Sequence, residues 1–348
     1  MNKKKVLLVS EYLNPPYDEG IKKTVYNLFI NLDKKYEVQA ICRYGFKQEN
    51  IHIVETNKLF FAKEIKRIIT HFNPDTLIYF PFQSSTFASY LRLKILSNYS
   101  KNSNSIFIAL QPKQLKSWQQ NLVKYLKPKI ALTPSPTLKK FWDKNGIDAK
   151  QIPLLTNLSI FKPLADTNQK KDLRLKYNLP SDAFIISHMG HLNQGRNLKS
   201  LIPLQKFGHQ VVVVASSSTP EDAKEQSDLK ETLEKQGIII IDRFIENIEE
   251  VYQLSDIYIF PVVKENSSIG MPLSVLEARA CGCPVVTTNY GSLELFLNND
   301  NNSIVYSTPN SFLEAVNSIK NRENANFKNT MVNTLNDQFY KTISNLID

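Results

Sequence analysis

The chain has 348 residues, of which 42% are hydrophobic and 10% aromatic, enough for two domains with separate cores. Its net charge of +10 is unevenly spread, because residues 1–165 carry +15 and residues 166–348 carry −5. No apolar run approaches ~18 residues, so no membrane span is expected, and three cysteines are too few for a disulfide framework or a zinc site.

Short apolar strands alternate with helical segments through the first half of the chain. Apolar residues at helical spacing, including Val25 and Leu32, predict a helix after the first strand. Further helices are expected near 60–72 and 84–97. The expected strands are 5–10, 37–42, 75–80, 105–110, 130–134 and 150–155. Strands that alternate with helices indicate βαβ units and a parallel sheet.

The alternation restarts after a polar, proline-containing stretch at 161–172. The strands expected there are 183–189, 210–216, 237–242, 256–261, 283–288 and 303–307, and 309–348 is mostly helical in pattern. We therefore predict an α/β protein with two doubly wound, Rossmann-like domains that face a central cleft. The predicted domains are 1–164 and 165–324, with a helix at about 325–348 that packs back on the first.

Ligands of open α/β sheets bind beyond the carboxyl ends of the strands. After the strand at 183–189, Gly190 and Gly195 bracket a turn that is expected to place Arg196 at the start of a helix. A helix N-terminus with an arginine makes a phosphate site. The alternative is an ordinary strand–helix turn with a surface arginine.

A similar loop follows the strand at 256–261. Gly270 permits close approach of the backbone to a ligand, and Pro272 suits the first turn of the next helix. Glu277 lies one to two turns into that helix, where its carboxylate could accept two hydrogen bonds from a ribose diol. The alternative is that Glu277 pairs with a neighbouring lysine or arginine.

The first lobe offers Gly20 as a third point of close approach, next to Lys22. Several motifs are absent: GxGxxG, the GxxxxGK[ST] phosphate loop, an Asp-x-Asp metal pair and GxSxG. Dinucleotide binding of the usual type is therefore disfavoured, and no metal site is predicted.

Together these residues resemble the retaining glycosyltransferase family 4, which has the GT-B fold. The signature at 260–295, FPVVKENSSIGMPLSVLEARACGCPVVTTNYGSLEL, carries the most specific likeness. The stretches 150–163 and 173–201 resemble the family's interdomain segment and the start of its second lobe, and the opening strand, glycine loop and helix are similar too. The likeness covers nearly the whole chain.

The resemblance implies transfer of a sugar from a nucleotide-sugar donor to an acceptor, with retention at the anomeric carbon and without a metal or cofactor. Arg196 corresponds to the basic residue on the donor pyrophosphate, and Glu277 to the carboxylate that holds the ribose. Gly20 corresponds to the glycine beside the phosphates. His191 stands where the family often has an arginine. Arg196 and Glu277 are the expected catalytic residues, with the lobes closing around the donor.

Other donor-binding residues are implied by the same resemblance. They are Gly190, Phe244 near the base, and the loop residues Glu265, Ile269, Gly270, Met271, Pro272 and Leu273. Ile269 replaces a family glutamate, and Glu265 is its candidate substitute. Gln111 lies in the region where the family often has a histidine that touches the sugar. Tyr17, Lys22 and Gln111 are the acceptor or sugar candidates.

The acceptor is expected to be a glycan or a lipid-linked molecule. Residues 111–129 carry five lysines, with Leu115, Trp118, Leu122 and Leu126 at helical spacing, a pattern typical of helices on anionic membranes. The alternative is a helix packed on its own sheet. The predicted location is the cytoplasm, with the inner face of the membrane as a candidate surface.

Rival functions remain open from the sequence. One is a phosphorylase or nucleotide-sugar epimerase on the same fold. Another is a degenerate GT-B protein that binds a nucleotide-sugar or a partner without catalysis, suggested by Ile269 and Gln111. Nucleic-acid binding is suggested only by charge, no motif supports it, and none is expected.

Overall fold

The computed structural model describes residues 3–17, 19–101, 103–166, 168–215, 223–297, 304–322 and 330–348. By contacts the chain forms two compact units. Unit 1 contains 1–155, 269–271 and 336–348, and unit 2 contains 156–268 and 272–335. The first few residues of the predicted C-terminal helix, 325–329, lie outside the described residues, as do residue 216 of one predicted strand and residue 303 of another.

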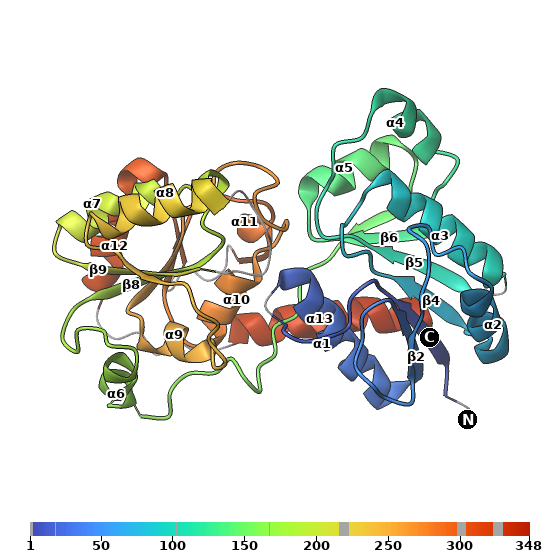
Figure 1. Cartoon of the computed structure of the whole chain (residues 1–348), viewed down its shortest axis with the longest axis horizontal. Coiled ribbons are helices and arrows are strands. Elements are labelled where there is room, and N and C mark those ends of the chain that lie inside the picture. Colours follow the sequence, from blue (N-terminus) through green and yellow to red (C-terminus); the bar gives the residue numbers. More distant parts are fainter. Residues whose placement is uncertain are drawn as a thin grey trace. The chain divides into compact units, whose positions relative to one another are not determined.

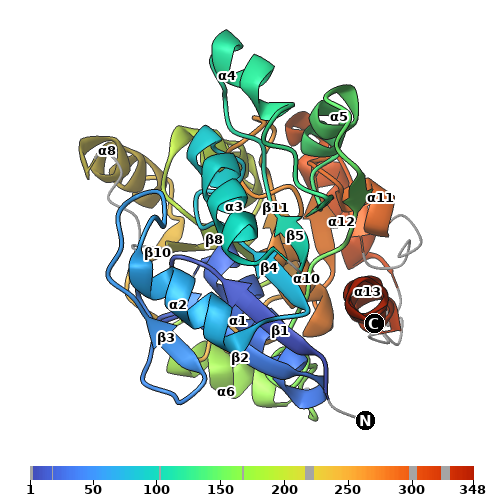
Figure 2. The same ribbon diagram turned by 90° about the vertical axis from the view of Figure 1, so that its right-hand side faces the viewer.

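Unit 1 contains a parallel sheet of seven described strands in the order β3-β2-β1-β4-β5-β6-β7. The strands are β1 Lys5–Val9, β2 Glu37–Cys42, β3 Ile51–Ile53, β4 Thr76–Tyr79, β5 Asn104–Ile108, β6 Ile130–Thr133 and β7 Ala149–Gln151. The helices are α1 Gly20–Lys35, α2 Lys63–Phe72, α3 Phe87–Tyr99, α4 Ser117–Val123 and α5 Pro136–Lys144. Helices α2, α3 and α5 pack on one face of this sheet in a continuous apolar core (Figure 2).

Unit 2 contains six described parallel strands in the order β10-β9-β8-β11-β12-β13. They are β8 Ile185–Gly190, β9 Gln210–Ala215, β10 Ile239–Ile241, β11 Ile257–Phe260, β12 Val285–Thr287 and β13 Ile304–Tyr306. This is the doubly wound order with a switch point between β8 and β11. Two such parallel α/β sheets confirm the predicted fold class.

The helices of unit 2 divide between the two faces of its sheet. Helices α7, α8 and α12 share an apolar core on one face, while α9 and α10 lie on the other (Figure 1). The bounds are α6 Gln169–Lys176, α7 Ile202–Lys206, α8 Ala223–Glu234, α9 Glu249–Leu254, α10 Leu273–Ala280, α11 Leu293–Leu297 and α12 Phe312–Lys320. Three 3-10 turns are η1 Gln194–Arg196, η2 Leu198–Leu201 and η3 Pro309–Ser311.

The last helix, α13 Thr330–Ile347, ends in unit 1. Its terminus is held there by Asp348, whose carboxylate accepts from Lys35 at 2.7 Å and from the Tyr36 hydroxyl at 3.2 Å. The amide of Asn104 donates to the Leu346 carbonyl at 3.2 Å. The final residues of the chain thus belong to the fold of unit 1.

Two predictions of local structure are wrong. The stretch 111–129 is not one long amphipathic helix, because α4 has only seven residues and a turn follows it. Leu115 is buried, whereas Trp118 and Leu122 are exposed. The strand predicted at 150–155 ends at Gln151, where pairing with β6 stops. The strand β3 was not anticipated, because three residues give too short a pattern.

Candidate functional site

The carboxyl ends of β8 and β11 carry two loops that pack on each other in unit 2. A Cβ atom added to Gly195 would lie 2.5 Å from the Ser267 Oγ and 3.0 Å from the Ser267 Cβ, so glycine suits this close approach. The side-chain amide of Asn197 donates to the Pro261 carbonyl at 3.1 Å. The Arg196 loop and the loop before α10 are therefore held together, as a site at the topological switch point requires.

Arg196 does not begin an α-helix, which corrects the sequence prediction. It is the last residue of the 3-10 turn η1, and its backbone N–H donates to the Asn193 side chain at 3.1 Å. Asn197 then adopts the left-handed conformation with φ 57°, which interrupts any helix, and α7 begins only at Ile202. The guanidinium rather than a helix N-terminus is thus the cationic element of this loop.

Glu277 is buried on α10 with 3% of its surface exposed. The hydroxyl of Tyr252, on α9, donates to Glu277 Oε2 at 2.8 Å. Burial and the Glu277 carboxylate raise the pKa of Tyr252 well above its usual value, so this hydroxyl remains a donor. The Tyr252 hydroxyl is therefore one hydrogen-bond partner of this carboxylate.

The charges of Arg196 and Glu277 both affect the pKa of one buried group, the hydroxyl of Tyr258. Burial raises the pKa of Tyr258, the Arg196 charge lowers it and the Glu277 charge raises it. The Tyr258 hydroxyl also bonds with Ser274 Oγ at 2.7 Å. The charges of the two residues predicted to hold the donor therefore both reach the Tyr258 hydroxyl in unit 2.

Tyr290 holds the loop before α10 by hydrogen bonds to the Ser268 backbone, a role that the sequence did not predict. Its hydroxyl accepts from the Ser268 N–H at 2.9 Å and donates to the Ser268 carbonyl at 2.7 Å. Arg196 and Glu265 both influence the pKa of Tyr290, which burial raises. Glu265 itself is exposed. The sequence carried no signal for Tyr252 or Tyr290, because single tyrosines fit any apolar pattern.

The residues around the start of α10 divide between the units. Pro272 is the N-cap of α10 rather than a residue of its first turn, and no side chain caps this helix. Leu273 follows it and is buried. Ile269, Gly270 and Met271 group with unit 1.

Gly270 has a close neighbour within the protein itself. Its N–H donates to the Leu110 carbonyl at 2.9 Å, and an added Cβ would lie 2.8 Å from the Ser135 Cα. Met271 is fully buried, and its sulfur accepts from the Leu154 N–H at 3.3 Å. Packing of unit 1 therefore accounts for the glycine at position 270 without a ligand.

The remaining candidates are spread out. Gly190 ends β8 and is followed by the partly exposed His191, whereas Phe244 lies in the loop after β10 with 66% of its surface exposed. In unit 1, Gly20 is the first residue of α1, and the Lys22 ammonium lies 5.6 Å from the centre of the Tyr12 ring.

Tyr17 and Gln111 are both partly buried in unit 1. The Tyr17 ring stacks on Tyr26 with centroids 4.1 Å apart, and burial raises the pKa of Tyr17 to about 12. The backbone of Gln111 is held by two hydroxyls, since its carbonyl accepts from Ser84 at 2.7 Å and from Ser85 at 2.9 Å. This fixes the loop that follows β5.

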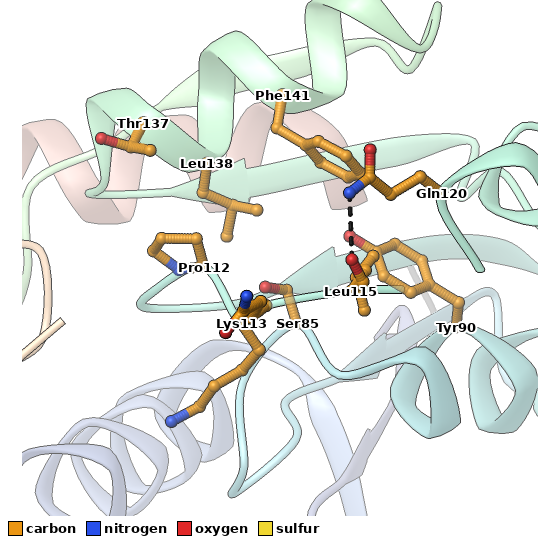
Figure 3. Close-up of a pocket in the computed structure, with 10 residues that line it drawn as sticks. Ser85, Tyr90, Pro112, Lys113, Leu115, Gln120, Thr137, Leu138 and Phe141 are labelled. Atoms are coloured by element: carbon orange, nitrogen blue, oxygen red, sulfur yellow. Dashed lines mark hydrogen bonds between the residues drawn. The ribbon is translucent and has the colours of Figure 1, made fainter. Parts of the chain in front are cut away.

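A cavity of about 260 Å³ opens directly beyond Gln111. Its walls are largely apolar, formed by Leu115, Leu138 and the rings of Tyr90 and Phe141 (Figure 3). Gln120 is tied to the wall, donating to the Leu115 carbonyl at 3.0 Å.

In Figure 3 the Lys113 side chain extends away from the rings of Tyr90 and Phe141, and its ammonium points away from the other lining residues. Surrounding protein atoms desolvate this ammonium and lower the pKa of Lys113. A cavity with largely apolar walls suits an apolar group.

The described residues also bear on metal and membrane binding. Among them, no group of three or more His, Cys, Asp or Glu side chains is arranged to hold a metal ion. None of the helices in the described ranges is long and apolar enough to span a bilayer. The three cysteines are free and buried, in line with the expected absence of a disulfide framework.

Comparisons with known proteins define the fold class. The chain resembles the solved structure of Anabaena HepE in complex with UDP-glucose, with a TM-score of 0.73, 13% identity and coverage of 98% and 99% of the two chains. A glycosyltransferase from Rickettsia africae matches with a TM-score of 0.74 and 18% identity, and the match covers 100% of this chain and 96% of the other. Sucrose-phosphate synthase from Thermosynechococcus elongatus matches with a TM-score of 0.71 and 15% identity, covering 99% of this chain and 95% of the other. The fold is that of GT-B glycosyltransferases.

Sequence comparison adds a narrower likeness. Residues 195–321 match the model of the family Glycosyl transferases group 1. Over 211 residues, 57% of this chain, the sequence is 26% identical to the UDP-Gal:alpha-D-GlcNAc-diphosphoundecaprenol alpha-1,3-galactosyltransferase of Escherichia coli. That match spans about half the length of the relative, 49%. Arg196 and Glu277 both fall inside the family match.

Proposed function

We propose that this protein is a retaining glycosyltransferase that takes its sugar from a nucleoside-diphosphate donor, with UDP-sugars as the first candidates. The carrying observation is that Arg196 lies in the turn after β8 and the buried Glu277 lies on α10, the helix that follows β11, so that both come after the two strands at the switch point of the unit 2 sheet. The names of two comparison proteins, one bound to UDP-glucose and one that uses UDP-galactose, support the choice of donor.

The proposed mechanism assigns each group one task. The Arg196 guanidinium donates to the diphosphate and stabilises the charge that develops on it as the sugar departs. Glu277, oriented by Tyr252, accepts from the ribose hydroxyls. The acceptor hydroxyl attacks from the face that the diphosphate leaves, and its proton passes to the departing phosphate. No metal or cofactor takes part in this scheme.

Calorimetric titration with UDP, GDP, ADP, CDP and dTDP tests the proposal. We expect one diphosphate to bind in the micromolar range and Arg196→Ala and Glu277→Ala each to weaken it at least tenfold. Arg67→Gln, at an exposed site on α2, is the matched control and leaves binding unchanged. If none of the five nucleotides binds more tightly than with a millimolar dissociation constant, the assignment is contradicted.

A turnover assay distinguishes a transferase from a protein that binds the nucleotide-sugar without catalysis. Ile269 at the position of a family glutamate, with Glu265 exposed, favours the degenerate, non-catalytic alternative. Release of UDP that depends on an added acceptor, with the product linkage of unchanged anomeric configuration by NMR, supports a retaining transferase. Tight UDP binding without any turnover supports the alternative instead, and turnover without acceptor favours an epimerase or phosphorylase.

We propose further that the acceptor is lipid-linked and is met at an anionic, cytoplasmic membrane surface. Trp118, Leu122 and Tyr125 expose 54%, 42% and 70% of their surfaces on and after α4. Lys116 precedes them in the chain, and Lys124 lies between Leu122 and Tyr125, with its ammonium 5.2 Å from the Tyr125 ring centre. Exposed aromatic side chains among lysines suit an anionic interface. The Lys113 cavity would take an apolar group next to a phosphate.

Vesicle sedimentation tests this surface. We expect binding to vesicles that contain phosphatidylglycerol, little binding to pure phosphatidylcholine, and at least a fivefold loss in the Trp118→Ala, Tyr125→Ala double variant. Phe61→Ala is the control, because this phenylalanine is 67% exposed elsewhere in unit 1. Equal binding to both vesicle types, or no effect of the double variant, would contradict the proposal.

A further inference from the structure

A histidine in the centre of the unit 2 sheet has one ring nitrogen committed to the fold. His188 lies on β8 and has none of its surface exposed. Its Nδ1 lies 2.9 Å from the Ile259 carbonyl on β11. A carbonyl only accepts hydrogen bonds, so Nδ1 carries the hydrogen. Burial, with the Arg196 charge as a smaller cause, lowers the pKa of His188 to about 3, so the ring is neutral and Nε2 holds a lone pair.

The other ring nitrogen, Nε2, is buried and has no hydrogen-bond partner among the described residues. A buried acceptor left in this state costs free energy, and it is unusual in a native structure. The rings of Tyr258 and Phe260 lie beside the imidazole, with centroids 6.2 and 6.3 Å away. These two rings pack on the imidazole, but they donate no hydrogen bond to Nε2.

Nε2 lies close to Gly190, and so does the Arg196 guanidinium. A Cβ added to Gly190 would lie 3.1 Å from the His188 Nε2 and 3.5 Å from the Arg196 Cζ. A side chain at position 190 would therefore crowd both the imidazole and the guanidinium. Glycine leaves room beside this acceptor and this strong donor.

We propose that Nε2 of His188 accepts an N–H of the Arg196 guanidinium when a nucleoside diphosphate is bound, and so orients Arg196 toward the phosphates. This inference rests on the proposed function and assigns His188 as a positioning residue. A lone pair at Nε2 would repel a phosphate oxygen but attracts a guanidinium.

The residue types fit this arrangement. Arginine has five N–H donors in a planar fork, so one can bond to Nε2 while others remain for the diphosphate. The ammonium of a lysine lacks that fixed fork. A neutral histidine also adds no charge that would compete with the phosphates for the arginine. The pairing therefore accounts for an arginine at position 196.

Two substitutions at position 188 separate the two ring nitrogens. His188→Asn keeps a donor where Nδ1 is and places no atom at Nε2. His188→Gln reaches the Nε2 position with an amide oxygen that can accept. In UDP titrations we expect His188→Asn to weaken binding about tenfold or more, the scale of one charge-assisted hydrogen bond. His188→Gln should stay within about threefold of wild type, and uridine binding should change in neither variant.

A double-mutant cycle with Arg196→Ala isolates the pair. If His188 acts through Arg196, then His188→Asn has no further effect on UDP affinity once Arg196 is alanine. Additive losses, wild-type affinity of His188→Asn, or an equal loss of uridine binding would overturn the inference while leaving the proposed function standing. Failure of the wild-type chain to bind any of the five diphosphates would overturn both.

A measurement on the unaltered chain covers the case in which His188→Asn does not fold. In ¹⁵N-histidine-labelled protein, the Nε2 resonance of His188 reports whether its lone pair accepts a hydrogen bond. We expect UDP to shift this resonance toward the hydrogen-bonded range and uridine to leave it in place. An unchanged Nε2 resonance at saturating UDP would contradict the inference.

Discussion

The single residue with the largest expected effect on pH stability is His188. Its pKa of about 3 in the folded chain lies below the unfolded value near 6.5. The unfolded state therefore binds the proton first as pH falls, and stability present above pH ~6.5 is lost on the way to pH ~3. At pH 4.5 the loss from this residue is about 3 kcal/mol.

Urea unfolding at several pH values measures this effect. We expect the free energy of unfolding of His188→Gln to fall less steeply than that of wild type between pH 6.5 and 4.5. His71→Gln, at an exposed site on α2, is the control and should keep the wild-type slope. Parallel pH profiles for His188→Gln and wild type would show that the buried imidazole does not titrate in this way.

Tyr252→Phe tests the hydrogen bond that orients Glu277. Removal of the hydroxyl takes a donor from a buried carboxylate, which should lower the free energy of unfolding by about 2 kcal/mol and weaken UDP binding. Tyr258→Phe is the matched control, because its hydroxyl bonds to the neutral Ser274 at 2.7 Å and should cost about 1 kcal/mol. Equal costs in the two variants would argue against a special role for the Tyr252 donor.

At the scale of elements, the site depends on how closely two loops approach. Gly195→Ala would place a Cβ 2.5 Å from the Ser267 Oγ and push apart the loops after β8 and β11. We expect UDP affinity to fall at least tenfold. Adding Ser267→Gly removes the obstructing atoms and should restore most of the affinity, as measured by calorimetry. A double variant as weak as Gly195→Ala alone would contradict a steric cause.

The loop elements also show where pattern reasoning is limited. The glycines at 190 and 195 correctly indicated a tight turn after β8, but not its type. Pro203 near the start of α7 and the left-handed Asn197 divide the expected helix into 3-10 turns, so Arg196 precedes it. Likewise the apolar spacing in 111–129 predicted one helix, yet tertiary contacts bury Leu115 and leave Trp118 exposed.

At the scale of the molecule, the core of unit 1 contains a network of buried charged and polar groups. In unit 1, Arg92 forms a buried ion pair with Glu11 and donates to the Tyr79 hydroxyl at 3.2 Å. Glu11 also accepts from the Phe82 N–H at 2.9 Å. This network joins the end of β1 to α3 and lies within the core of unit 1.

Arg92→Ala leaves the Glu11 charge buried without its partner, so we expect a loss of about 3–5 kcal/mol in the free energy of unfolding. Hydrogen exchange should show the loss of protection in the strands of unit 1. The exposed Lys139–Asp143 pair, 2.7 Å apart, provides the control, since Lys139→Ala should cost less than about 1 kcal/mol. A cost below 1 kcal/mol for Arg92→Ala would contradict the ion pair's structural role.

The sequence by itself determined the class of fold and its repeated strand–helix order, because burial on both sides of a parallel sheet demands continuous apolar strands such as β9 and β11. It also marked the chain positions of Arg196 and Glu277, since polar residues after such strands break that pattern. Only the tertiary structure decided their partners. Tyr252, Tyr290 and the unpaired nitrogen of His188 meet the site across strands far apart in sequence. Such contacts depend on distances in space, which no local spacing encodes.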